Sequence, residues 1–359
     1  MIMSRNRTSI QHEVAIIGGG PAGCAAALAL RARGHSVIVI SRETQKAKPT
    51  ETAVPALARL LRSLGAAEAL IACEPCHGIV SAWGSPTPTL LPGILNPYGH
   101  PWFIHRTRLD ARLQQIARDQ GAQWINGEAY SLVNDHDGVS ISTTREMVRA
   151  RWAVIAAGSP VSAARLTGQT AVQLDSMIAF WARLATNIEE RLLFVEPTNS
   201  GWWYLCPADG TGVIACFVTD PATARNLRPS EPARWNDLFS KTDLHRHANE
   251  ATATAVQVAL AGLATLSQLH GPYWVAVGDA AAKLDPLGSS GTATALDSGH
   301  CAAQAVADAL QGNRIPLEQY GTWTAGVVEE FTRQRRQHYQ YEARKQPNEF
   351  WSQRLLTAA

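Results

Sequence analysis

A glycine-rich turn near the start of the chain constrains its fold more than any other feature. Residues 14–17 are a short apolar run, residues 18–23 read Gly-Gly-Gly-Pro-Ala-Gly, and the alanine-rich residues 24–33 favour a helix. A second apolar run at residues 36–40 completes a strand, turn, helix and strand of about thirty residues. This pattern predicts a βαβ unit of a parallel sheet with a site for a dinucleotide, against the alternative of a purely structural glycine turn.

The residues of this turn have distinct expected roles. Gly18 permits the tight turn, Gly20 lets the backbone approach a pyrophosphate, and Gly23 allows the helix to pack closely on the strand. Pro21 and Ala22 complete the motif at the start of the helix, whose N-terminus attracts an anion. We therefore expect all five to belong to the nucleotide site.

The residue that should bind the ribose departs from the usual pattern. An acidic side chain is expected at the end of the second strand, and Ser41 stands there instead. Either Ser41 bonds the ribose hydroxyl, or Glu43, the nearest acid, turns back to do so. Arg42 is placed to meet a phosphate or the adenine face.

A second strand, glycine turn and helix is predicted far down the chain, at residues 273–296. Its distinctive residues are Gly278, Asp279, Pro286, Gly288, Gly291 and Thr292. If both glycine signatures face one ligand, the two ends of the chain must meet in space.

Together the two signatures resemble those of FAD-dependent proteins of the p-hydroxybenzoate hydroxylase and flavin-halogenase superfamily. The resemblance implies that Asp279 accepts hydrogen bonds from flavin hydroxyls, whereas an ordinary helix cap is the alternative. It also implies that the turn from Pro286 to Gly291 brings a helix N-terminus towards the isoalloxazine, where it can stabilise negative charge.

Three further segments match this superfamily. Glu51 and Thr52 lie in a turn similar to Gly-Glu-(Ser/Thr)-x-x-Pro, with Thr50 where glycine is usual. Arg106 lies in a segment that resembles the arginine-bearing start of a helix, so the resemblance makes it a flavin-site candidate; its alternative role is a solvated helix cap. Gly158 ends a segment similar to Asp-Ala-Thr-Gly, in which the polar residues are replaced.

Tryptophan-rich segments narrow the resemblance. The chain has 11 Trp against 7 Tyr and 7 Phe. The segments at residues 77–84, 201–207 and 339–351 look like those of bacterial FAD-dependent proteins that accompany lysine and glycine oxidases and oxygenate a tryptophan side chain on the way to a protein-derived quinone. The candidates for the aromatic walls of a substrate pocket are Trp83, Trp202, Trp203 and Tyr204. Strand alternation would point one of the adjacent rings Trp202 and Trp203 inward and the other outward.

The resemblance implies an α/β fold class: a Rossmann-like, glutathione-reductase-like FAD-binding domain, an inserted antiparallel β-sheet substrate domain and a C-terminal helical segment. We expect residues 1–80, 100–165 and 271–345 to form the FAD-binding domain, residues 81–99 and 166–270 the substrate domain, and residues 346–359 a tail. The alternating runs within residues 166–270 favour the antiparallel sheet.

The predicted function is a monooxygenase that hydroxylates an electron-rich ring, an indole above all, through a C4a-hydroperoxyflavin. The resemblance implies FAD as the cofactor and O2 as the co-substrate, with electrons from NAD(P)H directly or through a separate flavin reductase. The substrate is free, or is a Trp side chain of a partner protein or precursor peptide. Glu51, His77 and His105 are the acid or base candidates nearest the motifs, and the sequence does not choose among them.

Other enzyme classes are the alternatives. Flavin halogenases need a lysine downstream of the Glu-Thr turn, and no lysine occurs between Lys48 and Lys241. A reductase of the geranylgeranyl-reductase type is a second alternative enzyme, and a non-enzymatic FAD-binding partner protein is the remaining alternative.

Composition excludes several classes of protein. The net charge of +2 argues against a nucleic-acid binder, and no run of about 20 uncharged apolar residues predicts a membrane span. Cys73 and Cys76 lack the second ligand pair of a zinc site, so no metal is predicted. Without a recognisable signal peptide and with scattered cysteines, a cytoplasmic location is expected.

Overall fold

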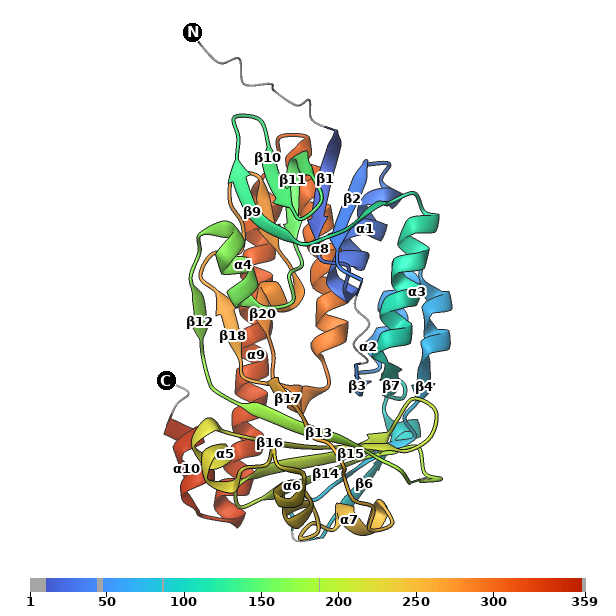
Figure 1. Cartoon of the computed structure of the whole chain (residues 1–359), viewed down its shortest axis with the longest axis vertical. Helices are drawn as coiled ribbons and strands as arrows, with labels where there is room; N and C mark the ends of the chain where they lie inside the picture. The colour runs from blue at the N-terminus through green and yellow to red at the C-terminus, as the bar shows by residue number, and fades with distance from the viewer. Residues whose placement is uncertain (1–10, 44–47, 86, 187, 357–359) are drawn as a thin grey trace.

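The computed structural model of this chain describes residues 11–43, 48–85, 87–186 and 188–356. Figure 1 shows two layers, one above the other: an upper layer with a mostly parallel sheet and long helices, and a lower layer built on a broad antiparallel sheet. The α/β fold class predicted from the sequence is confirmed.

The upper sheet contains both predicted nucleotide-binding strands. Its strands follow the order β8 (Gln123–Asn126), β2 (Val37–Ser41), β1 (His12–Ile17), β11 (Met147–Ile155), β10 (Val139–Thr143) and β9 (Ala129–Asn134), and β19 (Trp274–Ala276) also pairs with β11. Pairing is parallel from β8 to β11 and with β19, and antiparallel among β11, β10 and β9. Residues 14–17 are buried on both faces, as a covered parallel sheet requires.

Two helices from opposite ends of the chain pack together beside this sheet. They are α1 (Pro21–Ala32) and α8 (Gly291–Leu310). Their close approach needs small residues, because a Cβ at Gly299 of α8 would meet the carbonyl oxygen of Ala22 at 2.1 Å. The two glycine signatures therefore meet, as the sequence predicted.

The remaining upper elements surround this pair. They are α2 (Ala56–Ser63), α3 (Arg106–Asp119), α4 (Pro160–Thr167), the short helices η1 (Ala67–Ala72), η3 (Gly278–Ala280) and η4 (Pro286–Gly288), the sheet of β3 (Thr50–Ala53), β7 (Trp102–His105) and β4 (Cys73–Pro75), and the sheet of β12 (Ala171–Gln173), β18 (Ala264–Leu266) and β20 (Ala282–Lys283).

The lower sheet is largely antiparallel. Its order is β17 (Gln257–Leu260), β13 (Ile178–Leu184), β16 (Val213–Thr219), β15 (Gly201–Pro207), β14 (Leu192–Thr198), β5 (Gly78–Ser81) and β6 (Thr89–Pro92). The short helix η2 (Gly93–Leu95) follows β6, and α5 (Pro221–Leu227), α6 (Pro232–Phe239) and α7 (Leu244–His247) lie between β16 and β17.

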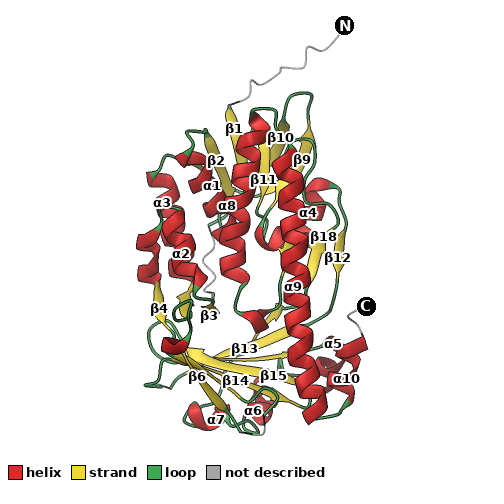
Figure 2. Ribbon diagram, turned by 180° about the vertical axis from the view of Figure 1, so that it is seen from behind, coloured by secondary structure: helices red, strands yellow, loops and turns green. Residues whose placement is uncertain are grey.

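A long C-terminal helix ties the layers together. Figure 2 shows α9 (Ile315–Lys345) running from the upper layer down past the lower sheet, where α10 (Glu349–Leu356) follows it. On this helix Arg335 pairs with Asp285 at 3.1 Å. None of the described helices has both the length and the apolar character that crossing a bilayer requires.

Candidate functional site

A cavity of about 490 Å³ lies between the two layers, lined from above by both glycine signatures and from below by the lower sheet. Gly20, Pro21 and Ala22 at the start of α1 and Gly291 and Thr292 at the start of α8 all border it. At neither helix start does the N-cap side chain accept a hydrogen bond from the first backbone N–H groups.

The first glycine turn is shaped by close backbone contacts. Gly18 has φ +112°, and a Cβ there would meet the Ala156 carbonyl oxygen at 2.1 Å; a Cβ at Gly23 would meet the Gly18 oxygen at 1.9 Å. A Cβ at Gly20 would have nothing within 4 Å. Gly18 and Gly23 thus build the turn, and Gly20 presents open backbone at the helix start.

The second signature brings a carboxylate to the cavity. Gly278 has φ +57° and donates its backbone N–H to the Ser298 hydroxyl at 2.8 Å, which fixes the turn. The next residue, Asp279, lines the cavity. Burial raises the pKa of Asp279 to about 6, although Lys283 opposes the shift.

An ion-pair cluster borders the cavity on the side of β3 and α3. Arg106 donates two hydrogen bonds of 2.8 Å from one nitrogen to the carboxylate of Glu51, which also accepts from the Thr292 hydroxyl at 3.3 Å. Arg106 also contacts Asp110 at 3.4 Å, and Asp110 contacts Lys48. Burial acts to lower the pKa of Arg106, but the two carboxylates outweigh it and raise the pKa above its ordinary value.

Two cross-strand rows of the lower sheet form the cavity floor. In one row Trp202 of β15, Val218 of β16, Ala179 of β13 and Ala259 of β17 are paired in register. Trp202, Ala179 and Ala259 of this row line the cavity.

The second row crosses the same strands two residues further along and lies on the same face. It joins Tyr204, Cys216 and Trp181, all of which line the cavity. Small side chains in the middle of the floor are thus bordered by aromatic ones. Burial raises the pKa of Tyr204 well above its ordinary value, so its hydroxyl remains protonated near neutral pH.

Many of the sequence-predicted site residues meet at this cavity. Those that line it are Gly20, Pro21, Ala22, Glu51, Thr52, Arg106, Gly158, Trp202, Tyr204, Asp279, Pro286, Gly291 and Thr292. Gly18, Gly23 and Gly278 shape its turns from behind, and Gly288 lies in η4 beside Phe331.

Both histidine candidates lie away from the cavity. His77 is exposed beside β5. His105, at the end of β7, is buried, with ring nitrogens 3.1 Å from a Glu74 oxygen and 3.4 Å from the Thr50 hydroxyl. Of the three predicted acid or base residues, Glu51 alone borders the cavity, because β3 faces it and the other two strand ends do not.

Two of the predicted aromatic walls, Trp83 and Trp203, do not line this cavity. Trp203 points to the opposite face of the lower sheet, where it stacks on Phe217 with ring centroids 4.8 Å apart and packs against Trp235. Trp83 lies behind Trp202, at 6.3 Å between centroids, and donates its ring N–H to the His338 carbonyl at 2.7 Å. In this structure both pack against other aromatic side chains.

The sequence missed several residues that line the cavity. Trp181 was not among the predicted aromatic walls, but the pairing of β13 with β16 brings it to the floor. Lys48 and Lys283 also line the cavity. No local signal marks these positions, because strand register and chain crossings place them.

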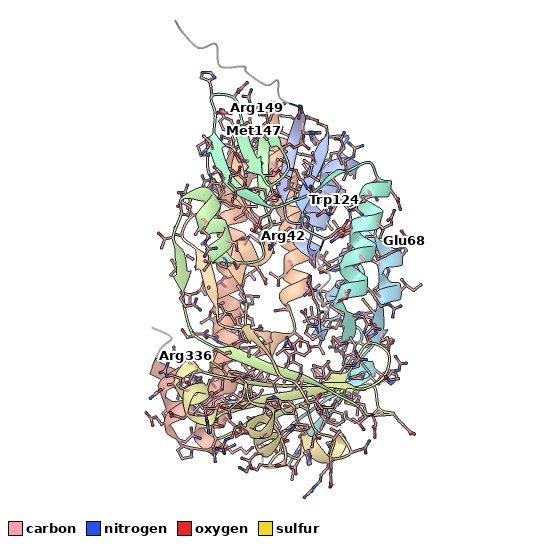
Figure 3. The ribbon with its side chains drawn as sticks, in the orientation of Figure 1. Arg42, Glu68, Trp124, Met147, Arg149 and Arg336 are labelled. Carbon is pink, nitrogen blue, oxygen red and sulfur yellow. The ribbon has the colours of Figure 1, made fainter. Side chains whose placement is uncertain are left out.

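The predicted ribose candidates lie at the carboxyl end of β2, outside the cavity lining. A Cβ at Gly19 would meet the Ser41 hydroxyl at 2.9 Å, so Ser41 borders the glycine turn. Glu43 is exposed, and Arg42 pairs with Glu128 at 3.2 Å. Figure 3 shows Arg42 in the upper layer, well away from the lower sheet. This arrangement favours Ser41.

Comparisons with known proteins agree with this geometry. The family model described as "FAD binding domain" matches residues 11–335. The FAD-dependent oxidoreductase LodB of Marinomonas mediterranea is 24% identical over 370 residues, which cover 97% of this chain and 98% of LodB.

Two solved structures share the fold. The peptidyl tryptophan dihydroxylase QhpG, essential for tryptophylquinone cofactor biogenesis, superposes with a TM-score of 0.79 at 22% identity, covering 96% of this chain and 78% of QhpG. The flavin-dependent brominase Bmp2 gives a TM-score of 0.80 at 20% identity, covering 97% of this chain and 93% of Bmp2.

Proposed function

The chain belongs to the FAD binding domain family, and from this premise we propose that this FAD-dependent oxidoreductase is a monooxygenase that hydroxylates an electron-rich aromatic ring, an indole above all. The observation that carries the proposal is the cavity itself. Two helix N-termini without side-chain caps border it from above, and Trp181, Trp202 and Tyr204 border it from below.

The upper half of the site fits FAD. The open backbone at Gly20 and the start of α1 suit the pyrophosphate, and Asp279 can accept hydrogen bonds from flavin hydroxyls. The start of α8, at Gly291 and Thr292, offers backbone N–H groups and positive dipole charge to an anionic flavin ring. When bound and reduced, FAD supplies the activation of O2.

The chain's own residues orient the reactants. Glu51 holds Arg106 beside the start of α8, so the guanidinium keeps positive charge at the cavity wall. The aromatic side chains of the floor can fix the plane of a substrate ring, each ring pair contributing about 0.5–1.5 kcal/mol beyond burial. They also cover this side of the cavity with apolar surface, which limits access of water.

Oxygen isotope incorporation tests the proposal. FAD-loaded protein is reduced anaerobically and mixed with ¹⁸O2 and either indole or a tryptophan-containing peptide. The masses of the products are then measured by mass spectrometry. We expect a mass gain that follows the isotope in the gas. The matched control is Ala179→Phe, which fills the floor and leaves the glycine signatures intact. Release of hydrogen peroxide without isotope in either probe would count against oxygenation.

One observation favours halogenation as a second candidate. The lysine missing from the expected stretch of sequence has a spatial counterpart, because Lys283 brings an amine to the cavity lining. Adding bromide to the same assay distinguishes the two functions: a halogenase gives brominated indole, and a monooxygenase gives the hydroxylated product at an unchanged rate.

A further inference from the structure

The positively charged side chains of the cavity differ in their partners. Of the described residues that line it, Lys48, Arg106 and Lys283 carry positive charge. The first two contact carboxylates of one cluster, Glu51 and Asp110. Among the described residues, Lys283 forms no ion pair of this kind. It is therefore the cavity cation that has charge to offer to a ligand.

Within the described part of the chain, Lys283 is held in place by a backbone carbonyl and not by a carboxylate. Its Nζ donates a hydrogen bond of 2.7 Å to the carbonyl of Leu260, at the end of β17. An ammonium group has three donors, so two remain for other partners. The side chain is half-buried; burial lowers the pKa of Lys283, although Asp279 partly opposes the shift. An anion beside this amine would restore the stability of its charged form.

The floor leads from this amine to the aromatic wall. Leu260 follows Ala259, which ends the paired row that begins at Trp202. Three strand spacings separate the two ends of this row, about 14 Å. Ala179 occupies the middle of the row with a single methyl group. A ligand lying on this floor can place a flat ring at the Trp202 end and a charged group at the Lys283 end.

Resting on the proposed oxygenation of an aromatic ring, we propose that Lys283 selects substrates that carry a carboxylate close to that ring. Two kinds of substrate carry such a carboxylate. It belongs to a free aromatic acid, or to an aspartate or glutamate next to the target tryptophan in a polypeptide. Lys283 is then a specificity-determining residue, and it takes no part in the oxygen chemistry.

Binding to the oxidised, FAD-loaded protein tests this assignment without turnover. Indole-3-acetate and indole-3-acetamide have nearly the same shape and differ in charge, and their dissociation constants are measured by equilibrium dialysis. Capped peptides containing Asp-Trp or Asn-Trp form the corresponding second pair. The variants are Lys283→Met, Lys283→Arg and, as a matched control, Lys48→Met, which removes a cavity lysine already engaged by Asp110. FAD affinity is measured for each variant.

We expect the unmodified protein to bind at least one carboxylate probe about tenfold more tightly than its amide, since a charge-assisted hydrogen bond contributes that much or more. Lys283→Met should abolish this preference, while Lys283→Arg and Lys48→Met retain it. A preference confined to the small acids or to the peptides identifies the source of the carboxylate.

The assignment is overturned by equal binding of both members of each pair by the unmodified protein, or by a preference that survives in Lys283→Met. Weaker binding of FAD and of both probes alike would also overturn it, because Lys283 would then serve the cofactor. If the isotope assay fails while the charge preference holds, the proposed oxygenation is wrong and the carboxylate site stands.

Discussion

Replacement of Asp279 by asparagine should make the FAD-depleted protein more stable at high pH. Asp279 has its pKa raised from 3.8 to about 6, chiefly by burial. The folded protein therefore carries a cost for the ionised carboxylate above pH 6. This cost falls as the pH drops through 6 and is absent below the unfolded value of 3.8.

The expected gain in stability follows from the difference between the two pKa values of Asp279, 3.8 unfolded and about 6 folded. At about 1.4 kcal/mol per pH unit, the raised pKa sets an upper limit of about 3 kcal/mol. Because Asp279 keeps some contact with solvent in the cavity, we expect a gain of about 1–3 kcal/mol in the free energy of unfolding at pH 8. Below pH 6 the difference between the two proteins should narrow by about 1.4 kcal/mol per unit.

Urea unfolding of both FAD-depleted proteins at pH 5 and pH 8 measures this difference. The matched control is Asp110→Asn, which removes a carboxylate partner of Lys48 and Arg106 and should lower stability at pH 8. In the presence of FAD the order should reverse, since Asp279→Asn loses a proposed cofactor contact and FAD stabilises what it binds. An Asp279→Asn protein that is no more stable at pH 8, or whose advantage is the same at pH 5, would refute the reasoning.

Further predictions concern the glycine turn, both faces of the lower sheet and His77. Gly18→Ala should prevent folding or lower the free energy of unfolding, measured by thermal unfolding, by more than about 3 kcal/mol, because its Cβ would overlap a carbonyl oxygen. Gly20→Ala should fold, because nothing lies near its Cβ, and should bind FAD more weakly in a titration. Trp203→Ala should lower the free energy of unfolding, measured with urea, by about 3–5 kcal/mol, as expected for the loss of a buried ring. Ala179→Phe should retain FAD and lose indole binding in dialysis; equal binding would exclude the floor as the substrate site. His77→Ala should leave kcat unchanged in the isotope assay, because the side chain lies outside the cavity.

The sequence predicts what local patterns determine. A strand, glycine turn and helix within thirty residues restricts the backbone through Gly18 and Gly23, so the upper part of the site follows from short motifs. The convergence of the second signature with the first also follows, since the resemblance predicts one ligand for both and both border one cavity. His77 and His105 do not line the cavity, because closeness to a motif along the chain does not determine which face of a strand end meets the cavity.

The substrate half depends on register, which short patterns do not contain. Alternation correctly separates Trp202 from Trp203, but it cannot say which of them faces the cavity, because a shift of one residue in strand pairing exchanges the two faces. The same register, carried through Cys216 of β16 to β13, brings Trp181 to the floor. Lys283 reaches the opposite end because β20, from the upper layer, meets the last residue of β17. The proposed substrate residues of this chain therefore depend on strand pairing and chain crossings, whereas its nucleotide motifs are local in the sequence.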